Sequence, residues 1–341
     1  MKTRRRYPVW AGSVVMLLVL ALLWTGCGSQ ENGAGTRTTA HPGDRRADVR
    51  GAEGGPYYFI AVHNEPCHRP NGRQQIAESY AILKEMVERA DEYNVKLTLM
   101  FSAQWAGYIA ESPERLAEVR SWKERGHEIA AHHHDIYHGN WDGYTDYPRE
   151  EVEAMRVRMW GFSEEYLGTL DDYMRELHRI DPDIKSGCLN DEFDKRALPD
   201  EIIYDTGSGF ANHGEPGTRE DDRTSPSKGV NEFVTVGTVK GIERKWLAHY
   251  QITNPQRTKA AMEAFGKLDG GVYGVVLHST TSEAQELYEF LEFLHQYDPD
   301  GRYSKTVTEI IEEGLLPEVR LSDEVINETY EQEVPGWEKK G

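Results

Sequence analysis

Short apolar runs alternate with longer amphipathic stretches along most of the chain. The runs are rich in branched and aromatic residues and have the length of buried strands, whereas the longer stretches repeat apolar residues at helical spacing. Strands separated by helices favour a parallel sheet of the α/β class, and this many strand–helix units favour a (β/α) barrel. Strands are expected at residues 57–62, 96–101, 128–131, 184–189, 201–205, 233–239 and 272–277, and helices at 73–93, 112–125, 149–180, 255–268 and 283–297.

The first 27 residues differ from the rest in having a basic start and an apolar centre. Lys2 and residues 4–6 are basic, residues 14–24 are apolar but short for a membrane span, and Cys27 follows a small residue. This segment resembles a bacterial lipoprotein signal, in which Cys27 is lipidated and becomes the mature N-terminus. The alternative is an uncleaved signal anchor. In both cases the body of the protein is expected to be exported, and cleavage would anchor it to the cell envelope by lipid.

Residues 28–56 contain almost no apolar side chain, so they cannot bury enough surface to fold and are expected to form a flexible tether. The following residues, about 285 in number, suit one large domain. The net charge of the chain is −19, and the signal holds four basic residues and no acid, which leaves −23 for the exported part. This charge argues against nucleic acid and against an anionic membrane surface as partners, so membrane contact is expected only through the lipid anchor.

Residues 126–138 hold five of the thirteen histidines of the chain. A predicted strand at 128–131 runs directly into His132, His133, His134 and Asp135, and His138 follows four residues after His134. Ligand sites of α/β folds lie at the carboxyl ends of strands, and neutral imidazole is the commonest metal ligand in proteins. The cluster therefore predicts a metal site rather than a solvated polar loop.

Two further predicted strands also end in histidine. The first strand is followed by His63 and Glu65, and the strand at 272–277 is followed by His278. Because the carboxyl ends of parallel strands lie on one face of a barrel, these residues are expected to share a site with the histidine cluster.

These three strand ends resemble the motifs of the polysaccharide deacetylase family, whose unit is the NodB homology domain. The match is close at Gly126-His127-Glu128-Ile129 and at Val275-Val276-Leu277-His278. The resemblance covers residues 57–314, implies a distorted (β/α) barrel, and leaves residues 315–341 as a C-terminal extension. It departs from the family at the first strand, where His63-Asn64-Glu65 replaces an Asp-Asp pair, and at residue 185, where a lysine is the only cation in place of the usual arginine.

The resemblance implies a role for each residue of the site. Glu65 would bind the metal and His63 would be the base, with Glu65 as the alternative base. His278 would be the general acid, and His132, His134 and His138 are candidates for two or three ligand places, between which the sequence does not decide. The implied cofactor is a divalent metal, most simply Zn²⁺, because histidines and a carboxylate suit that ion.

Four further residues are expected near this site. Asp135 is expected to bind the metal or to orient a ligand. Asp205 ends another predicted strand and either faces the site or forms a turn before Thr206-Gly207. Cys67 and Cys188 lie in an exported chain at the same predicted face, so a disulfide between them is expected. The alternatives are that both are small buried residues, or that Cys67 is a soft metal ligand.

The resemblance implies a metal-dependent enzyme that removes acetyl groups from a polysaccharide or amino sugar at the cell surface. The expected partner is thus a carbohydrate polymer or oligosaccharide. Two alternatives remain open: a glycan-binding relative that has lost activity, and a glycoside hydrolase that uses Glu65 and Asp205 as its carboxylate pair.

Overall fold

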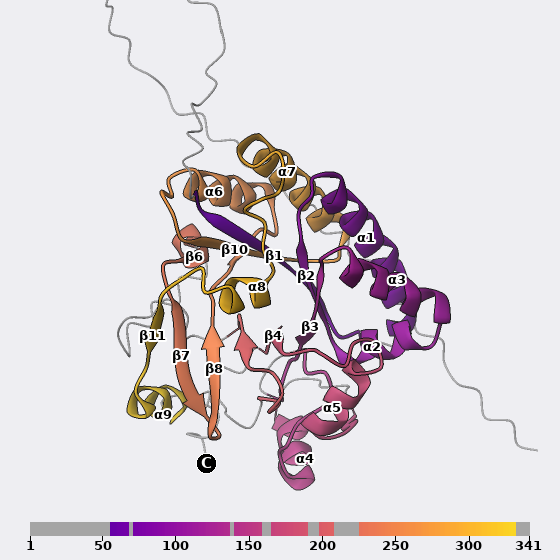
Figure 1. The fold of residues 1–341 in the computed structure, drawn as a ribbon. Helices are drawn as coiled ribbons and strands as arrows, with labels where there is room; N and C mark the ends of the chain where they lie inside the picture. The colour runs from indigo at the N-terminus through magenta and orange to yellow at the C-terminus, as the bar shows by residue number, and fades with distance from the viewer. Residues whose placement is uncertain are drawn as a thin grey trace, which may run out of the picture. The chain divides into compact units, whose positions relative to one another are not determined.

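The computed structural model describes residues 55–67, 71–136, 140–158, 165–189, 198–207 and 225–331. All of them belong to one compact unit, residues 48–341 (Figure 1). The predicted signal, most of the predicted tether and His138 lie outside the described residues.

The described strands form a single eleven-stranded sheet that curls into a half-barrel (Figure 1). Its centre is parallel, as the strand–helix pattern predicts, and runs β8-β5-β4-β3-β2-β1-β10. The strands are β1 (Tyr57–Asn64), β2 (Leu97–Phe101), β3 (Glu128–His132), β4 (Ser186–Cys188), β5 (Tyr204–Asp205), β8 (Ile242–Trp246) and β10 (Val272–His278).

Other strands extend this parallel centre at both ends. Beyond β8 lie the antiparallel β7 (Val234–Val239) and then β11 (Glu318–Arg320), and beyond β10 lie β6 (Val230–Asn231) and β9 (Tyr250–Gln251). Among the described residues no pairing joins β11 to β6, so the sheet is an open curl there. The predicted α/β class is confirmed, and the predicted barrel is a half-barrel in the described part of the chain.

Helices cover the outer side of the curl, where Figure 1 shows α7, α1 and α3 in sequence beside the strands. Ser112 accepts a hydrogen bond from the backbone of Arg115, and Pro113 is the first residue of α3. None of the described helices has the length and apolar character needed to cross a membrane. The helices are α1 (Gly72–Glu92), α2 (Ala103–Ala110), α3 (Pro113–Glu124), α4 (Arg149–Arg158), α5 (Leu170–Leu177), α6 (Pro255–Phe265), α7 (Thr281–Tyr297), α8 (Val307–Glu312) and α9 (Asp323–Glu331).

The sheet separates two apolar clusters, and strand alternation decides which residues enter each. In β1, Tyr58, Ile60 and Val62 pack towards the outer helices. Phe59 and Ala61 instead face the inside of the curl, together with Ala130 of β3 and Val276 of β10. Because side chains alternate along a strand, the next inward positions are His63, His132 and His278. The period of two thus brings three histidines to the inner carboxyl ends of the strands.

The opposite end of the curl is filled by α8. Val307, Ile310 and Ile311 belong to the inner apolar cluster. A capping box formed by Thr306 and Glu309 begins this helix. Apolar packing therefore occupies the end of the half-barrel that faces away from the histidines.

Candidate metal centre

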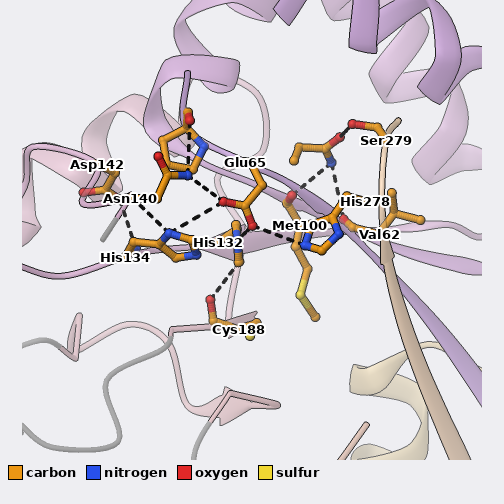
Figure 2. A network of polar contacts seen from close by, with 12 residues as sticks. Val62, Glu65, Met100, His132, His134, Asn140, Asp142, Cys188, His278 and Ser279 are labelled. Carbon is orange, nitrogen blue, oxygen red and sulfur yellow. Dashed lines mark hydrogen bonds and ion pairs between the residues drawn. The ribbon is translucent and has the colours of Figure 1, made fainter. Parts of the chain in front are cut away.

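The carboxylate of Glu65 lies at the centre of a ring of imidazoles (Figure 2). Its Oε1 is 3.0 Å from Nε2 of His132 and 3.4 Å from Nε2 of His278, and its Oε2 is 3.6 Å from Nδ1 of His134. The structure therefore brings together Glu65 from the end of β1, His132 and His134 from the end of β3, and His278 from the end of β10.

A hydrogen-bonded clasp holds two of these strand ends together. The side chain of Asn64 donates to the backbone oxygen of Met100 at 2.9 Å and accepts from the hydroxyl of Ser279 at 2.9 Å. Since Asn64 precedes Glu65 and Ser279 follows His278, the clasp fixes the separation of their backbones. The backbone oxygen of Glu65 also accepts from the indole of Trp105 at 3.0 Å.

His132 has the hydrogen-bonding pattern of a metal ligand. Its Nδ1 lies 3.1 Å from the backbone oxygen of Cys188, and a carbonyl only accepts, so Nδ1 carries the proton. With that proton on Nδ1, a neutral ring would have its lone pair on Nε2, which faces the Oε1 of Glu65. Two acceptors at 3.0 Å require a cation between them, either a proton or a metal ion. A divalent metal ion fits here, because Glu65, His132 and His134 each offer a ligand atom and these atoms lie within 4.8 Å of one another.

The ionisation state of Glu65 also supports a cation site. Burial alone would raise the pKa of the Glu65 carboxyl, but the neighbouring His132, His278 and His134 lower this pKa well below its usual range. The carboxylate is therefore ionised throughout the physiological range and is available to bind a cation.

His278 is paired on its other side with Glu283, in the first turn of α7. The Oε2 of Glu283 accepts from Nδ1 of His278 at 2.8 Å and from the backbone N–H of His278 at 2.8 Å. Burial alone would lower the pKa of His278, but the hydrogen bonds to Glu283 and Glu65 outweigh burial and raise this pKa to about 10. The ring is therefore an imidazolium at neutral pH.

His63 packs against the ligands and carries no carboxylate hydrogen bond at Nε2. Its ring stacks on His132 with centroids 4.1 Å apart, and its buried Nε2 has no hydrogen-bond partner among the described residues. Burial and the neighbouring His132, His249 and His278 hold the pKa of His63 well below its usual value. The ring is therefore neutral, and one of its nitrogens lies within 4.8 Å of ligand atoms of both Glu65 and His278.

Several residues of the centre were missed in the sequence. His249 lies edge-on to His63 with centroids 5.6 Å apart, and burial, together with the nearby Lys228, lowers its pKa to about 3. Glu283 stands three residues after Thr280, a spacing that indicates a helix cap. Thr280 does cap α7, but the Glu283 carboxylate turns back to His278. No local signal marks Asn140, which donates to Glu65 at 2.8 Å.

The remaining residues of the predicted cluster and Asp205 make contacts of their own. Burial alone would lower the pKa of His133, but Asp142, 2.7 Å away, and the buried Asp135 raise it. In Asp205, Oδ1 accepts from the backbone N–H groups of Leu189 at 3.3 Å and Gly207 at 2.8 Å, as a turn-forming aspartate does. Burial raises the pKa of Asp205 to about 6. His138 falls in residues 137–139, outside the described residues.

The predicted Cys67–Cys188 disulfide is absent from the structure, which holds both residues as thiols. The Sγ of Cys67 turns to the backbone oxygen of Glu65, 3.6 Å away in its own loop. The Sγ of Cys188 instead points to the inside of the curl, within 4.8 Å of a ring nitrogen of His63 and of His132. The two strand ends share a face, as expected, but the side chains are directed to different neighbours.

One of the two closely matching motifs, Gly126-His127-Glu128-Ile129, has a structural role. The Nδ1 of His127 accepts from the backbone N–H of Leu97 at 3.0 Å, and its Nε2 donates to Asp91 at 3.1 Å. Glu128 accepts from Thr98 at 3.0 Å and from the hydroxyls of Ser186 and Thr308. Both residues join β2, β3, β4 and α8 at the end of the sheet opposite to the metal ligands.

Comparison with known proteins gives fold likeness only. The sequence matches no family model and no curated protein. A presumed polysaccharide deacetylase from Mycobacterium smegmatis is 13% identical, with a TM-score of 0.45, over 80% of this chain and 96% of that chain. The 4-alpha-glucanotransferase from Thermococcus litoralis is 15% identical, with a TM-score of 0.45, over 78% of this chain and 41% of that chain. At such values neither structure bears on the activity of this chain.

Proposed function

We propose that the chain is a metal-dependent hydrolase that removes acetyl groups from carbohydrate. The observation that carries this proposal is the Glu65 carboxylate surrounded by His132, His134 and His278, with Nε2 of His132 3.0 Å from Oε1. Such a carboxylate and imidazole set at strand ends suits a divalent ion with an open coordination position.

Three residues would hold the ion: Glu65, His132 and His134. A divalent ion such as Zn²⁺, once bound, would supply a water activated at neutral pH and would polarise the acetyl carbonyl. The clasp from Asn64 to Ser279 would keep Glu65 at a fixed place relative to His278 during this chemistry.

His278 supplies the proton that the leaving group needs. Glu283 holds Nδ1–H, so the proton of Nε2 is the one directed into the site, beside Oε1 of Glu65. A protonated ring with a pKa of about 10 is fully charged at neutral pH and donates its proton to the departing amine or alcohol.

His63 is the residue we assign as base. It is neutral, inward-facing and within reach of the same group of ligand atoms, so it accepts a proton from the attacking water. Glu65 is the alternative base, but its two oxygens already contact His132, His278 and Asn140.

The substrate class follows from the sequence motifs rather than from the shape of the site. The Gly-His-Glu-Ile and Leu-His motifs resemble those of polysaccharide deacetylases, which supports an acetylated polysaccharide or oligosaccharide as substrate. The lipoprotein-like start of the chain supports action at the cell surface.

The test is an acetate-release assay on the full chain purified in detergent and loaded with Zn²⁺. Acetylated chito-oligosaccharides and O-acetylated xylan oligomers would serve as the two substrates, and Glu65→Gln as the inactive control. We expect acetate from at least one substrate and none with the control. Metal binding without acetate release would indicate a glycan-binding protein, and release of shortened sugars without acetate would indicate a glycoside hydrolase.

A further inference from the structure

Asn140 contacts two proposed metal ligands that come from different strands. Its side-chain Nδ2 donates to Oε2 of Glu65 at 2.8 Å, and its backbone oxygen accepts from Nδ1 of His134 at 3.0 Å. Figure 2 shows Asn140 beside both residues. A single residue thus bridges the end of β1 and the segment that follows β3.

We propose that Asn140 is a positioning residue that selects the atoms by which Glu65 and His134 bind the metal, an inference that rests on the proposed metal-dependent function. A carbonyl oxygen accepts only, so the bond to Asn140 places the proton of neutral His134 on Nδ1 and leaves the lone pair on Nε2. The Nδ2–H bond holds Oε2 of Glu65 towards Asn140 and directs Oε1 towards Nε2 of His132 and of His278. Glu65 would therefore bind the ion through Oε1.

The segment that carries Asn140 is itself anchored to the histidine turn by Asp142. The backbone N–H of Asp142 donates to the backbone oxygen of His134 at 3.1 Å, and its Oδ2 accepts from Nδ1 of His133 at 2.7 Å. Gln104 of α2 donates to the backbone oxygen of Asp142 at 2.6 Å. Since Asp142 and His133 are fully buried, Asn140 approaches the ligands from a rigid support.

This arrangement has a consequence for the coordination number. One carboxylate oxygen and two imidazoles make a three-ligand set, which leaves a fourth tetrahedral position for water or substrate. If Oε2 were released, Glu65 would be able to bind through both oxygens and to raise the coordination number. Asn140 therefore acts on the geometry of the ion as well as on its affinity.

The test replaces Asn140 with leucine, which keeps the branching of the side chain, and with alanine; both remove the donor to Glu65 and keep the backbone carbonyl that accepts from His134. Affinity would be measured by competition between the full-length protein and a chelator for Zn²⁺, and coordination by the visible absorption of the Co²⁺-loaded protein. We expect affinity to fall by roughly 10- to 100-fold in both variants, as is usual when an orienting partner of a ligand is lost. The Co²⁺ bands should weaken, because tetrahedral Co²⁺ absorbs more strongly than higher-coordinate Co²⁺.

Thr306→Ala is the matched control, because it removes the cap of α8 at the far end of β1 and lowers stability without touching the ligands. It should leave Zn²⁺ affinity and the Co²⁺ spectrum unchanged. Unaltered affinity and spectrum in both Asn140 variants would overturn the inference even if the wild-type protein releases acetate. If the variants lose affinity but the wild-type protein releases no acetate, the positioning role stands and the deacetylase proposal fails. If the wild-type protein binds neither Zn²⁺ nor Co²⁺, both the positioning role of Asn140 and the proposed metal-dependent function are wrong.

Discussion

At the scale of single residues, the site depends on which nitrogen of each histidine carries a proton. Backbone carbonyls decide this for His132 and His134, and a carboxylate decides it for His278. The three rings therefore have different tasks, although they surround one carboxylate. In the proposed metal centre, two of them would present lone pairs to a cation, and the third would present a proton.

Replacing His278 with alanine separates proton donation from metal binding. His278 is not among Glu65, His132 and His134, so the variant should retain one Zn²⁺ per chain by elemental analysis. It should lose roughly 10²- to 10⁴-fold in kcat for acetate release, the usual contribution of a general acid. Loss of the metal would move His278 into the ligand set, and full activity would remove it from the mechanism.

Replacing Glu283 with glutamine tests how the proton is held. Burial works against the raised pKa of His278, and the hydrogen bond to Glu283 is the contact that raises this pKa most, so its loss should lower the pKa. A general acid works only while protonated, so the alkaline limb of the kcat profile should move to lower pH in the variant. A profile identical to that of the wild-type protein would show that another group controls this limb.

The sequence predicts the convergence of His63, Glu65, His132, His134 and His278 because each directly follows a buried strand, and parallel strands end at one face. It does not predict Asn140, because the role of that residue depends on where a loop returns after leaving β3. It also misplaces the two cysteines. A shared face says nothing about side-chain direction, and Cys188 turns inward while Cys67 turns to its own loop.

At the scale of elements, the ends of the sheet have separate tasks. The proposed metal ligands lie where the strands end, whereas His127 and Glu128 connect elements where the strands begin. Of the two motifs that resemble the polysaccharide deacetylases, one therefore stabilises the sheet and only the other, which ends in His278, contacts the site.

Replacing His127 with leucine should lower stability and weaken its pH dependence. The variant leaves the backbone N–H of Leu97 without its acceptor, which costs roughly 1–3 kcal/mol. Burial lowers the pKa of His127 in the fold, so as the pH falls below about 6.5 the unfolded chain takes up the proton first and stability falls.

Urea unfolding of metal-free protein at pH 7.5 and pH 5.5 would measure both effects. The wild-type protein should lose stability between the two values, and the variant should lose less, because one of the histidines with a lowered pKa is gone. An equal loss in both proteins would contradict the assigned role of His127. His63 and His249 remain as further histidines of this kind.

Element boundaries show where the sequence pattern is insufficient. The predicted helix at 149–180 is interrupted: α4 ends at Arg158, and a capping box of Thr169 and Asp172 begins α5. The strand β8 was not predicted, because its centre is charged. Its Arg244 is fully buried and donates to the backbone oxygens of Ile202 and Pro199, contacts that only the folded sheet provides.

At the scale of the whole molecule, the C-terminal segment packs on β7, near one open edge of the half-barrel. In this segment β11 pairs with β7, and α9 places Ile326 on that strand. Gly237 of β7 leaves the space for this contact, because a Cβ there would lie 2.1 Å from the Cδ1 of Ile326. The sequence predicted these residues only as an extension, since a three-residue exposed strand has no distinct pattern.

Replacing Ile326 with alanine should therefore destabilise the domain without altering the metal centre. The side chain is 1% exposed and belongs to the large outer apolar cluster, so its loss should cost roughly 2–5 kcal/mol. Val319→Ala in β11 is the control, because Val319 is 39% exposed and its truncation should cost little.

Urea unfolding would measure the stability of both variants, and Zn²⁺ competition at low urea would measure the affinity of the metal centre. The proposed ligands stand at the ends of β1 and β3, several strands from β7, so affinity should stay unchanged while stability falls. If Ile326→Ala weakens Zn²⁺ binding as well, the half-barrel is coupled across its width, and the C-terminal segment is then part of what holds the ligand strands in place.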